Sequence, residues 1–199
     1  LKKGQHERNV LFWAIGQQNE NIFHFLFEDV FCKIFKIKEF AYEVIDIGEI
    51  FLHYVARYGS VSMLKCTLDK LKNELSPVEL QNLIKLKSKY GHNLLHCAVI
   101  QNKYKNSVEF LANFIENEVG KEEVRRMLSE LDHLDRLPLH CSAFFNNSKM
   151  FEFSFSLYVT YFTKNEIQNF LQQKTVKDKN IFELARENSE NPEMFENLK

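Results

Sequence analysis

The stretch Gly91–Ala98 reads GHNLLHCA, and the same short pattern returns along the chain at a nearly constant spacing. Good copies are Gly48–Ala56, which reads GEIFLHYVA, and Asp135–Ala143, which reads DRLPLHCSA. Degenerate copies stand at Asn9–Ala14 and Asn180–Ala185. The position of the histidine is held in turn by Phe12, His53, His96, His140 and Glu183. Successive copies are therefore 41 to 44 residues apart, which predicts a chain of repeated structural units.

A second motif, a glutamate followed by apolar residues, recurs in phase with the first. It occurs at Glu79–Ile84, Glu123–Leu128 and Glu166–Leu171, with a poorer version at Glu39 and Phe40. In the three good copies the glutamate lies 17 residues before the histidine position. Apolar residues at i, i+3 and i+4 are typical of an amphipathic helix. Each unit therefore contains at least two helical parts in a fixed register.

Capping signals mark where two of these helices begin. Ser76 with Glu79, and Thr163 with Glu166, have the spacing of capping boxes, in which each side chain satisfies a backbone N–H of the other residue. Pro77 suits the first helical position, because the N–H that proline lacks would have no hydrogen-bond partner within the helix there. The sequence predicts helix starts near residues 77 and 164.

A third helix per unit is predicted after each Leu-His element, where residues such as Val61, Leu64 and Leu68 are again spaced helically. The segment Phe151–Leu157 alternates like a half-buried strand, but it occupies a slot that is helical in the neighbouring copies. We therefore expect it to be helical. The predicted fold class is all-α, with units of about 43 residues that contain three helices.

The composition of the chain agrees with one soluble globular domain and excludes several classes. Of 199 residues, 45% are hydrophobic and 27% are charged, and no apolar stretch approaches the roughly 20 residues that cross a bilayer. The net charge of −1 gives no overall positive field for nucleic acid. The chain begins with Leu1 and not Met, so we expect a piece of a longer protein and infer nothing from the lack of a targeting signal.

The repeated residues resemble ankyrin repeats, whose pattern places a turn glycine before Thr-Pro-Leu-His and small residues after it. The second copy matches at Gly48, Leu52, His53, Ala56 and Gly59. The fourth copy matches at Asp132, Pro138, Leu139, His140 and Ala143, with Asp135 in place of the turn glycine. Ankyrin units have about 33 residues, so the additional residues are assigned to the third helix. HEAT and armadillo repeats have about this period and are the competing architecture, but the turn signature favours ankyrin.

The resemblance covers almost the whole chain and implies an ankyrin-like repeat solenoid with lengthened units that carry an extra helix. A single domain is expected over residues 1–199. Its approximate repeats are 4–45, 46–88, 89–131, 132–174 and 175–199. A narrower likeness, from Gly48 to Leu64 followed by a unit with an insertion at Asn102–Ser107, is to the inhibitor-of-NF-κB-like ankyrin proteins of insect-associated viruses. That family implies a Rel-type transcription factor as the partner.

The three histidines His53, His96 and His140 allow a structural and a metal-binding interpretation. His92 and Cys97 lie close to His96 in sequence, as zinc ligands would. One histidine per unit reflects repetition, however, and in ankyrin-like stacks this histidine resembles a residue that hydrogen-bonds the backbone of the adjoining turn. We expect structural histidines, no metal site and no cofactor.

The cysteines are expected to be free thiols. Cys97 and Cys141 occupy equivalent positions of adjacent units, and packed helices stand about 8–10 Å apart, beyond the roughly 7 Å limit between the Cα atoms of a disulfide. Cys32 and Cys66 also lie in apolar periodic stretches, so reduced thiols in the cytoplasm or nucleus are expected. No glycine-rich phosphate loop, nucleophile elbow or oriented Cys-His pair is present, so we expect neither an enzyme nor a small-molecule substrate.

The expected function is recognition of a protein partner through the concave face of the solenoid. In ankyrin-like units the residues of the turn and those just after the alanines contact partners. Carried onto this sequence, these positions are Gln17, Ile47, Glu49, Arg57, Tyr58, Tyr90, His92, Ile100, Gln101, His133, Arg136, Phe144 and Phe145. Arg57, Tyr58, Phe144 and Phe145 are expected to dominate, because Arg and aromatic residues are often hot spots. Replacing Arg57 and Phe145 by Ala is expected to abolish binding with helicity unchanged.

Several alternatives remain open at this point. Phe144 and Phe145 are expected to include at least one exposed ring, although both rings could pack under the third helix. Lys85, Lys87, Lys89, Lys103 and Lys105 could form a basic patch for nucleic acid or a lipid headgroup, or a solvated helix face. Trp13, Phe23, Phe25, Phe27 and Phe31 are expected to form the core of the first repeat, with an exposed aromatic surface as the alternative. The chain could also be the ankyrin domain of a larger channel, enzyme or effector.

Overall fold

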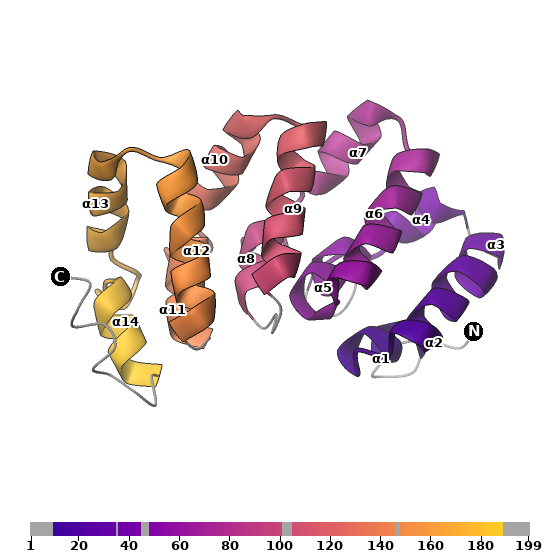
Figure 1. Ribbon diagram of the computed structural model, residues 1–199, viewed down its shortest axis with the longest axis horizontal. Helices are drawn as coiled ribbons and strands as arrows, with labels where there is room; N and C mark the ends of the chain where they lie inside the picture. Colours follow the sequence, from indigo (N-terminus) through magenta and orange to yellow (C-terminus); the bar gives the residue numbers. More distant parts are fainter. Residues whose placement is uncertain (1–9, 35, 45–47, 101–104, 146–147, 189–199) are drawn as a thin grey trace.

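The chain folds as a row of helices that follow one another from the N-terminus to the C-terminus (Figure 1). The computed structural model describes residues 10–34, 36–44, 48–100, 105–145 and 148–188. Within these residues there is no β-strand, and extended pairing is limited to one isolated bridge between Val44 and Ile50. The predicted all-α class is confirmed.

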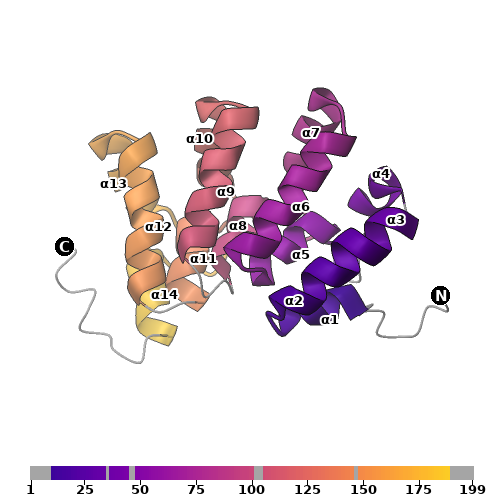
Figure 2. The ribbon, with the colours of Figure 1, turned by 45° about the vertical axis from the view of Figure 1, so that its right-hand side comes forward.

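Three consecutive units have the same three helices. They are α5 (Phe51–Tyr58), α6 (Val61–Glu74) and α7 (Pro77–Ile84), then α8 (Leu94–Ile100), α9 (Lys105–Glu118) and α10 (Lys121–Ser129), then α11 (Pro138–Phe145), α12 (Ser148–Tyr161) and α13 (Lys164–Gln172). Helix α14 (Ile181–Asn188) takes the place of α11 in the last unit. The long helices α6, α9 and α12 lie side by side, and α7, α10 and α13 follow one another along one edge of the row (Figures 1 and 2).

The capping boxes begin the helices where the sequence predicts them. In α7 the Ser76 Oγ accepts from the Glu79 N–H, and the Ser76 N–H donates to the Glu79 carboxylate at 2.8 Å. Thr163 and Glu166 repeat this exchange at the start of α13. The helix starts predicted near residues 77 and 164 are confirmed.

The segment Phe151–Leu157 is helical, as expected, and lies within α12. The buried residues of α12 recur at the spacing of one helix face. They are Met150, Phe151, Ser154, Leu157, Tyr158 and Tyr161. The apparent alternation arises because Phe153 and Phe155, on the sides of the same helix, are also partly buried against the core. Aromatic residues on the helix flanks therefore mask the helical period.

The first unit is more broken than the others. It comprises α1 (Val10–Gly16), α2 (Glu20–His24), the π-helix η1 (Phe25–Phe31), α3 (Cys32–Ile34) and α4 (Ile37–Ala41). Phe23 and Phe27 are buried, and the Phe27 ring stacks on Phe51 of the next unit at 5.6 Å between centroids. Trp13 and Phe25 are instead largely exposed, so the expectation that all five aromatic residues form the core is wrong for these two.

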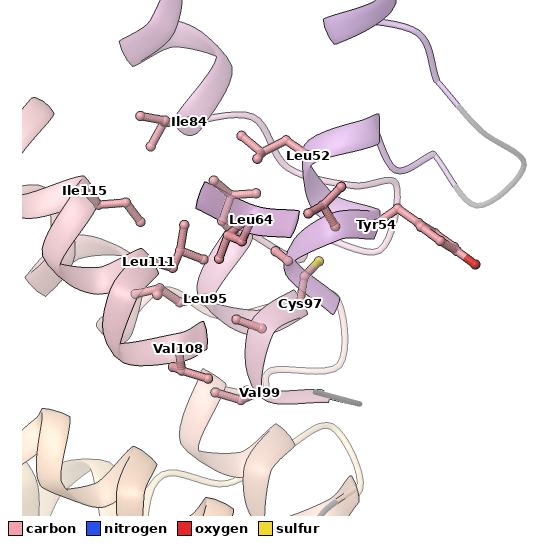
Figure 3. Close-up of a cluster of buried hydrophobic side chains, with 14 of the residues drawn as sticks. Leu52, Tyr54, Leu64, Ile84, Leu95, Cys97, Val99, Val108, Leu111 and Ile115 are labelled. Atoms are coloured by element: carbon pink, nitrogen blue, oxygen red, sulfur yellow. The ribbon is translucent and has the colours of Figure 1, made fainter. Parts of the chain in front are cut away.

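The core runs continuously between neighbouring units. Figure 3 shows Leu52 and Leu95 of the short helices facing Leu64 and Leu111 of the long ones. Each of these side chains is almost fully buried, and burial of such a residue stabilises a fold by about 1.5–3 kcal/mol. Because every unit contributes to the cores on both of its sides, the interfaces between units hold the row together.

One backbone position in each turn adopts a left-handed conformation, five residues before the histidine position. The residues there are Gly48, Gly91, Asp135 and Asp178, with φ of 66°, 79°, 53° and 56°. Asp135 thus adopts the conformation of the turn glycine that it replaces, because Asp tolerates the left-handed region better than most residues. At Gly91 the fit is also tight, since a Cβ atom there would lie 2.8 Å from His133 Cδ2.

The three histidines join each unit to the next by the same pair of hydrogen bonds. In each ring Nδ1 accepts from a backbone N–H three residues earlier, which belongs to Ile50, Asn93 or Leu137. Nε2 donates to a carbonyl in the connection that leads to the next unit, 3.1 Å away at Leu86, 2.9 Å at Arg136 and 2.8 Å at Gln173. The structural interpretation of these histidines is confirmed for the described residues.

The left-handed turn position gives a paired test. Gly91→Ala is expected to lower the free energy of unfolding by at least about 1–2 kcal/mol, because it adds both backbone strain and a contact with His133. Asp135→Gly is expected to be neutral or stabilising by up to about 1 kcal/mol, because glycine adopts this φ without strain. Urea unfolding followed by circular dichroism measures both, and equal effects of the two changes would contradict the assignment.

The buried histidines predict a pH dependence. Burial lowers the pKa of His53 and of His96 to about 4, whereas the unfolded chain takes up these protons near pH 6.5. The unfolded state therefore binds more protons in this window, and stability present above about pH 6.5 is lost as the pH falls toward 4. Each such proton is worth up to about 1.4 kcal/mol per pH unit.

The expected result is a fall of at least about 2 kcal/mol in the free energy of unfolding between about pH 7.5 and pH 5, measured by urea unfolding. Val159→Ala is the matched control, because Val159 is exposed and its side chain does not titrate, so the slope should not change. A free energy of unfolding that stays constant over this range would contradict the role of the buried imidazoles.

Candidate interaction surface

The residues expected to contact a partner differ in how far the structure exposes their side chains. Ile47 and Gln101 lie outside the described residues. Gln17, Tyr90, His133 and Phe145 are exposed. Tyr58, Arg136 and Phe144 are half-buried.

The exposure expected for Glu49, Arg57, His92 and Ile100 is corrected by the structure, which buries all four side chains. Arg57 retains only 7% of its surface, so it is not available as an interface hot spot in this conformation. The cause is the interface between units, where α5 packs directly against α8. Arg57 near the end of α5 and Ile100 at the end of α8 are covered there.

The Arg57 guanidinium lies at the centre of a buried polar cluster. Its Nη2 donates to the Glu49 carboxylate and lies 3.3 Å from His92 Nδ1 and 3.6 Å from Cys97 Sγ. Glu49 comes from the preceding turn, and His92 and Cys97 come from the next unit. The guanidinium therefore forms an ion pair with a carboxylate of its own unit and also contacts two residues of the next unit.

The cluster continues into the following unit through His92. The ring Nε2 donates to Asp132 Oδ2 at 3.2 Å, and Arg136 Nε donates to the same oxygen at 2.8 Å. Although burial acts to raise it, hydrogen bonds from His92 and Arg136 hold the pKa of Asp132 below its ordinary value. Asp132 therefore stays ionised, and the chain of contacts from Glu49 to Arg136 crosses three units.

The expectation that at least one of Phe144 and Phe145 is exposed is confirmed. Phe145 retains 42% of its surface, while Phe144 is half-buried. Their ring centroids are 4.8 Å apart in an edge-to-face arrangement. The Arg136 guanidinium lies 5.7 Å from the centroid of the Phe145 ring. The same arginine thus contacts both the buried cluster and an exposed aromatic ring.

A further set of exposed residues occupies the tips of successive turns, and we call it the turn-tip row. Its members are Lys89, Tyr90, His133, Leu134 and Val176. The turns are joined by backbone hydrogen bonds, from the His133 N–H to the Tyr90 carbonyl at 3.0 Å and from the Val176 N–H to the Leu134 carbonyl at 3.1 Å. Tyr90, Leu134 and Val176 are 47%, 44% and 55% exposed, so apolar surface runs along the joined tips.

Sequence analysis missed Leu134 and Val176. The signal that could have found them is the register, because the row occupies the positions six and seven residues before the histidine position. Side-chain hydrogen bonds hold the tips in place: Ser88 Oγ accepts from the Tyr90 N–H at 3.2 Å, and Asp132 Oδ1 accepts from the Leu134 N–H at 2.8 Å. Exposed side chains are thus presented on ordered backbone.

Two lysines of the basic segment contact neighbouring side chains. Lys87 Nζ lies 2.8 Å from a Glu130 oxygen, and Lys89 Nζ lies 5.2 Å from the centroid of the Tyr90 ring. Lys103 and the side chain of Lys105 lie outside the description. No helix of the described chain is both long enough and apolar enough to span a bilayer. All four cysteines are free, with Cys97 and Cys141 buried and Cys32 and Cys66 half-buried.

The buried cluster changes the outcome expected for Arg57→Ala. Removing the guanidinium leaves the Glu49 carboxylate buried without its partner, which typically costs about 3–5 kcal/mol. Urea unfolding should therefore show a strongly destabilised protein. Phe145→Ala is the matched control, and we expect it to cost less than about 1 kcal/mol because the ring is largely exposed. Equal stability of the two variants would refute the structural role of Arg57.

Comparisons with known proteins add no functional assignment to this surface. No protein-family model matches the chain. No curated protein matches it either. Function must therefore be argued from the geometry of the chain itself.

Proposed function

We propose that this chain is a protein-recognition module of the ankyrin type, which binds a protein partner through the turn-tip row and the adjoining exposed ring of Phe145. The observation that carries the proposal is the apolar surface of Tyr90, Leu134 and Val176 on three consecutive turns. Contiguous exposed apolar surface is a mark of interaction sites. The proposal assigns no catalytic role to the chain.

The ankyrin assignment is supported by three features that recur in register. A left-handed residue stands five positions before the histidine position, the histidine hydrogen-bonds the backbone of the connection to the next unit, and successive units stack in a row. The extra helix of each unit, α7, α10 or α13, lies along one edge of the row (Figure 1).

The row is suited to binding because its members are held in place before a partner arrives. The turn tips are fixed by the backbone hydrogen bonds between turns and by the backbone N–H groups that donate to the Ser88 and Asp132 side chains. A surface that is already ordered loses little conformational entropy on binding. Tyr90 also offers a large ring with a polar hydroxyl, the type of side chain that is enriched at hot spots.

The test is an affinity capture from cell extract with the full chain and two sets of variants. Tyr90→Ala combined with Leu134→Ala removes the centre of the row, and we expect it to weaken binding of the partner at least about tenfold. Val78→Ala combined with Val159→Ala is the matched control, because these exposed valines lie on α7 and α12. The control is expected to bind as the parent chain does.

Mass spectrometry identifies the retained proteins, and circular dichroism checks that each variant is folded. A protein captured by the parent and the control but lost by the row variant supports the proposal. Capture of the same proteins by all three chains would overturn the proposed surface. A Rel-type transcription factor among the lost proteins would favour the narrower resemblance.

A further inference from the structure

Three side chains of the kinds that bind metal ions, a histidine, a glutamate and a cysteine, meet between the first unit and α6. His24 is the last residue of α2, Glu28 lies in η1, and Cys66 lies in α6. One ligand atom from each residue lies within 4.8 Å of the other two. Glu28 Oε1 is 3.3 Å from His24 Nδ1 and 3.0 Å from Cys66 Sγ.

These separations are close to those of a tetrahedral zinc site. Zinc bonds of about 2.3 Å to sulfur and about 2.0–2.2 Å to nitrogen and oxygen place neighbouring ligand atoms roughly 3.4–3.6 Å apart. His24 and Glu28 are already at this spacing. The Glu28 oxygen and the Cys66 sulfur need to separate by about 0.6 Å, which a small side-chain rotation provides.

The orientation of His24 is fixed by a second residue of α6. His24 Nε2 lies 2.9 Å from Ser62 Oγ, one helical turn before Cys66. Histidines that bind a metal through one ring nitrogen generally hydrogen-bond through the other. Without a metal, Nδ1 donates to the Glu28 carboxylate and Nε2 accepts from the Ser62 hydroxyl; when an ion binds Nδ1, the ring proton is carried by Nε2 and donated to Ser62 Oγ. Helix α6 thus supplies both a ligand and the residue that aims another.

The charge around the cluster also favours a cation. The carboxylates of Glu28 and Asp69 lie near Cys66 and make its surroundings negative. Among the described residues, no Lys or Arg forms an ion pair with Glu28. His24 and Glu28 are partly exposed, so an ion can reach them from solvent.

A second cluster, Glu49, His92 and Cys97, has the same donor types but already holds a positively charged side chain. All three residues are buried, and Arg57 Nη2 lies among them. That cluster already contains its cation. The cluster of His24, Glu28 and Cys66 differs in this respect, because among the described residues no guanidinium lies between its ligand atoms.

We propose that His24, Glu28 and Cys66 form a binding site for a divalent metal ion of the zinc class. The ion bonds to His24 Nδ1, a Glu28 oxygen and the Cys66 thiolate, while the thiol proton leaves to solvent and water completes the coordination. The mixture of sulfur, nitrogen and oxygen donors suits Zn²⁺ and disfavours Mg²⁺ and Ca²⁺. The bound ion joins the first unit to α6.

The test uses the full chain and Co²⁺ as a spectroscopic probe, with Zn²⁺ binding measured by calorimetry. We expect one ion per chain, with a thiolate-to-Co²⁺ charge-transfer band that disappears in Cys66→Ser and persists in Cys97→Ser. His24→Gln is expected to weaken Zn²⁺ binding at least about tenfold, and Ser62→Ala by about 10–100-fold. Zn²⁺ should raise the melting temperature of the parent chain but not that of Cys66→Ser.

Circular dichroism without metal establishes that each variant is folded. A folded parent chain that shows neither the band nor heat of Zn²⁺ binding would overturn the proposal. A band that survives in Cys66→Ser and disappears in Cys97→Ser would also overturn it, because the ion would then bind the buried cluster. Neither outcome bears on partner binding by the turn-tip row.

Discussion

The stack depends on one pair of hydrogen bonds that is made three times, between a buried imidazole and backbone groups at the connections between units. His53, His96 and His140 each accept from a backbone N–H with one nitrogen and donate to a backbone carbonyl of the connection to the next unit with the other. Buried backbone groups at these turns would otherwise lack partners at a considerable cost. Acceptance at Nδ1 requires a neutral ring, and the pair of bonds requires a turn of one fixed shape. The left-handed residue before each helix provides that shape.

The sequence could predict features that repeat or that are local. The 41 to 44-residue register predicted the three-helix units, and the Ser76 and Thr163 boxes predicted where α7 and α13 begin, because capping depends on residues only three positions apart. The same register relates Tyr90 to Leu134 and His133 to Val176, which occupy equivalent turn positions of successive units. Periodicity was least informative in α12, where partly buried Phe153 and Phe155 flank the core face.

The sequence could not predict the surroundings of Arg57, since its partners come from separate parts of the chain. Glu49 lies eight residues before it and His92 lies 35 residues after it, and only the packing of α5 against α8 brings the three together. An arginine near the end of a helix is usually exposed. The meeting of His24, Glu28 and Cys66 has the same origin, because Cys66 is 38 residues from Glu28.

The polar chain from Glu49 through Arg57, His92 and Asp132 to Arg136 has a consequence for how the protein opens. In many repeat proteins each unit interacts only with its nearest neighbours, so terminal units can fray one at a time. Here His92 pairs with both Arg57 and Asp132, and loss of one contact leaves charged groups without partners in the other. We therefore expect the three middle units to open as one cooperative block in hydrogen exchange.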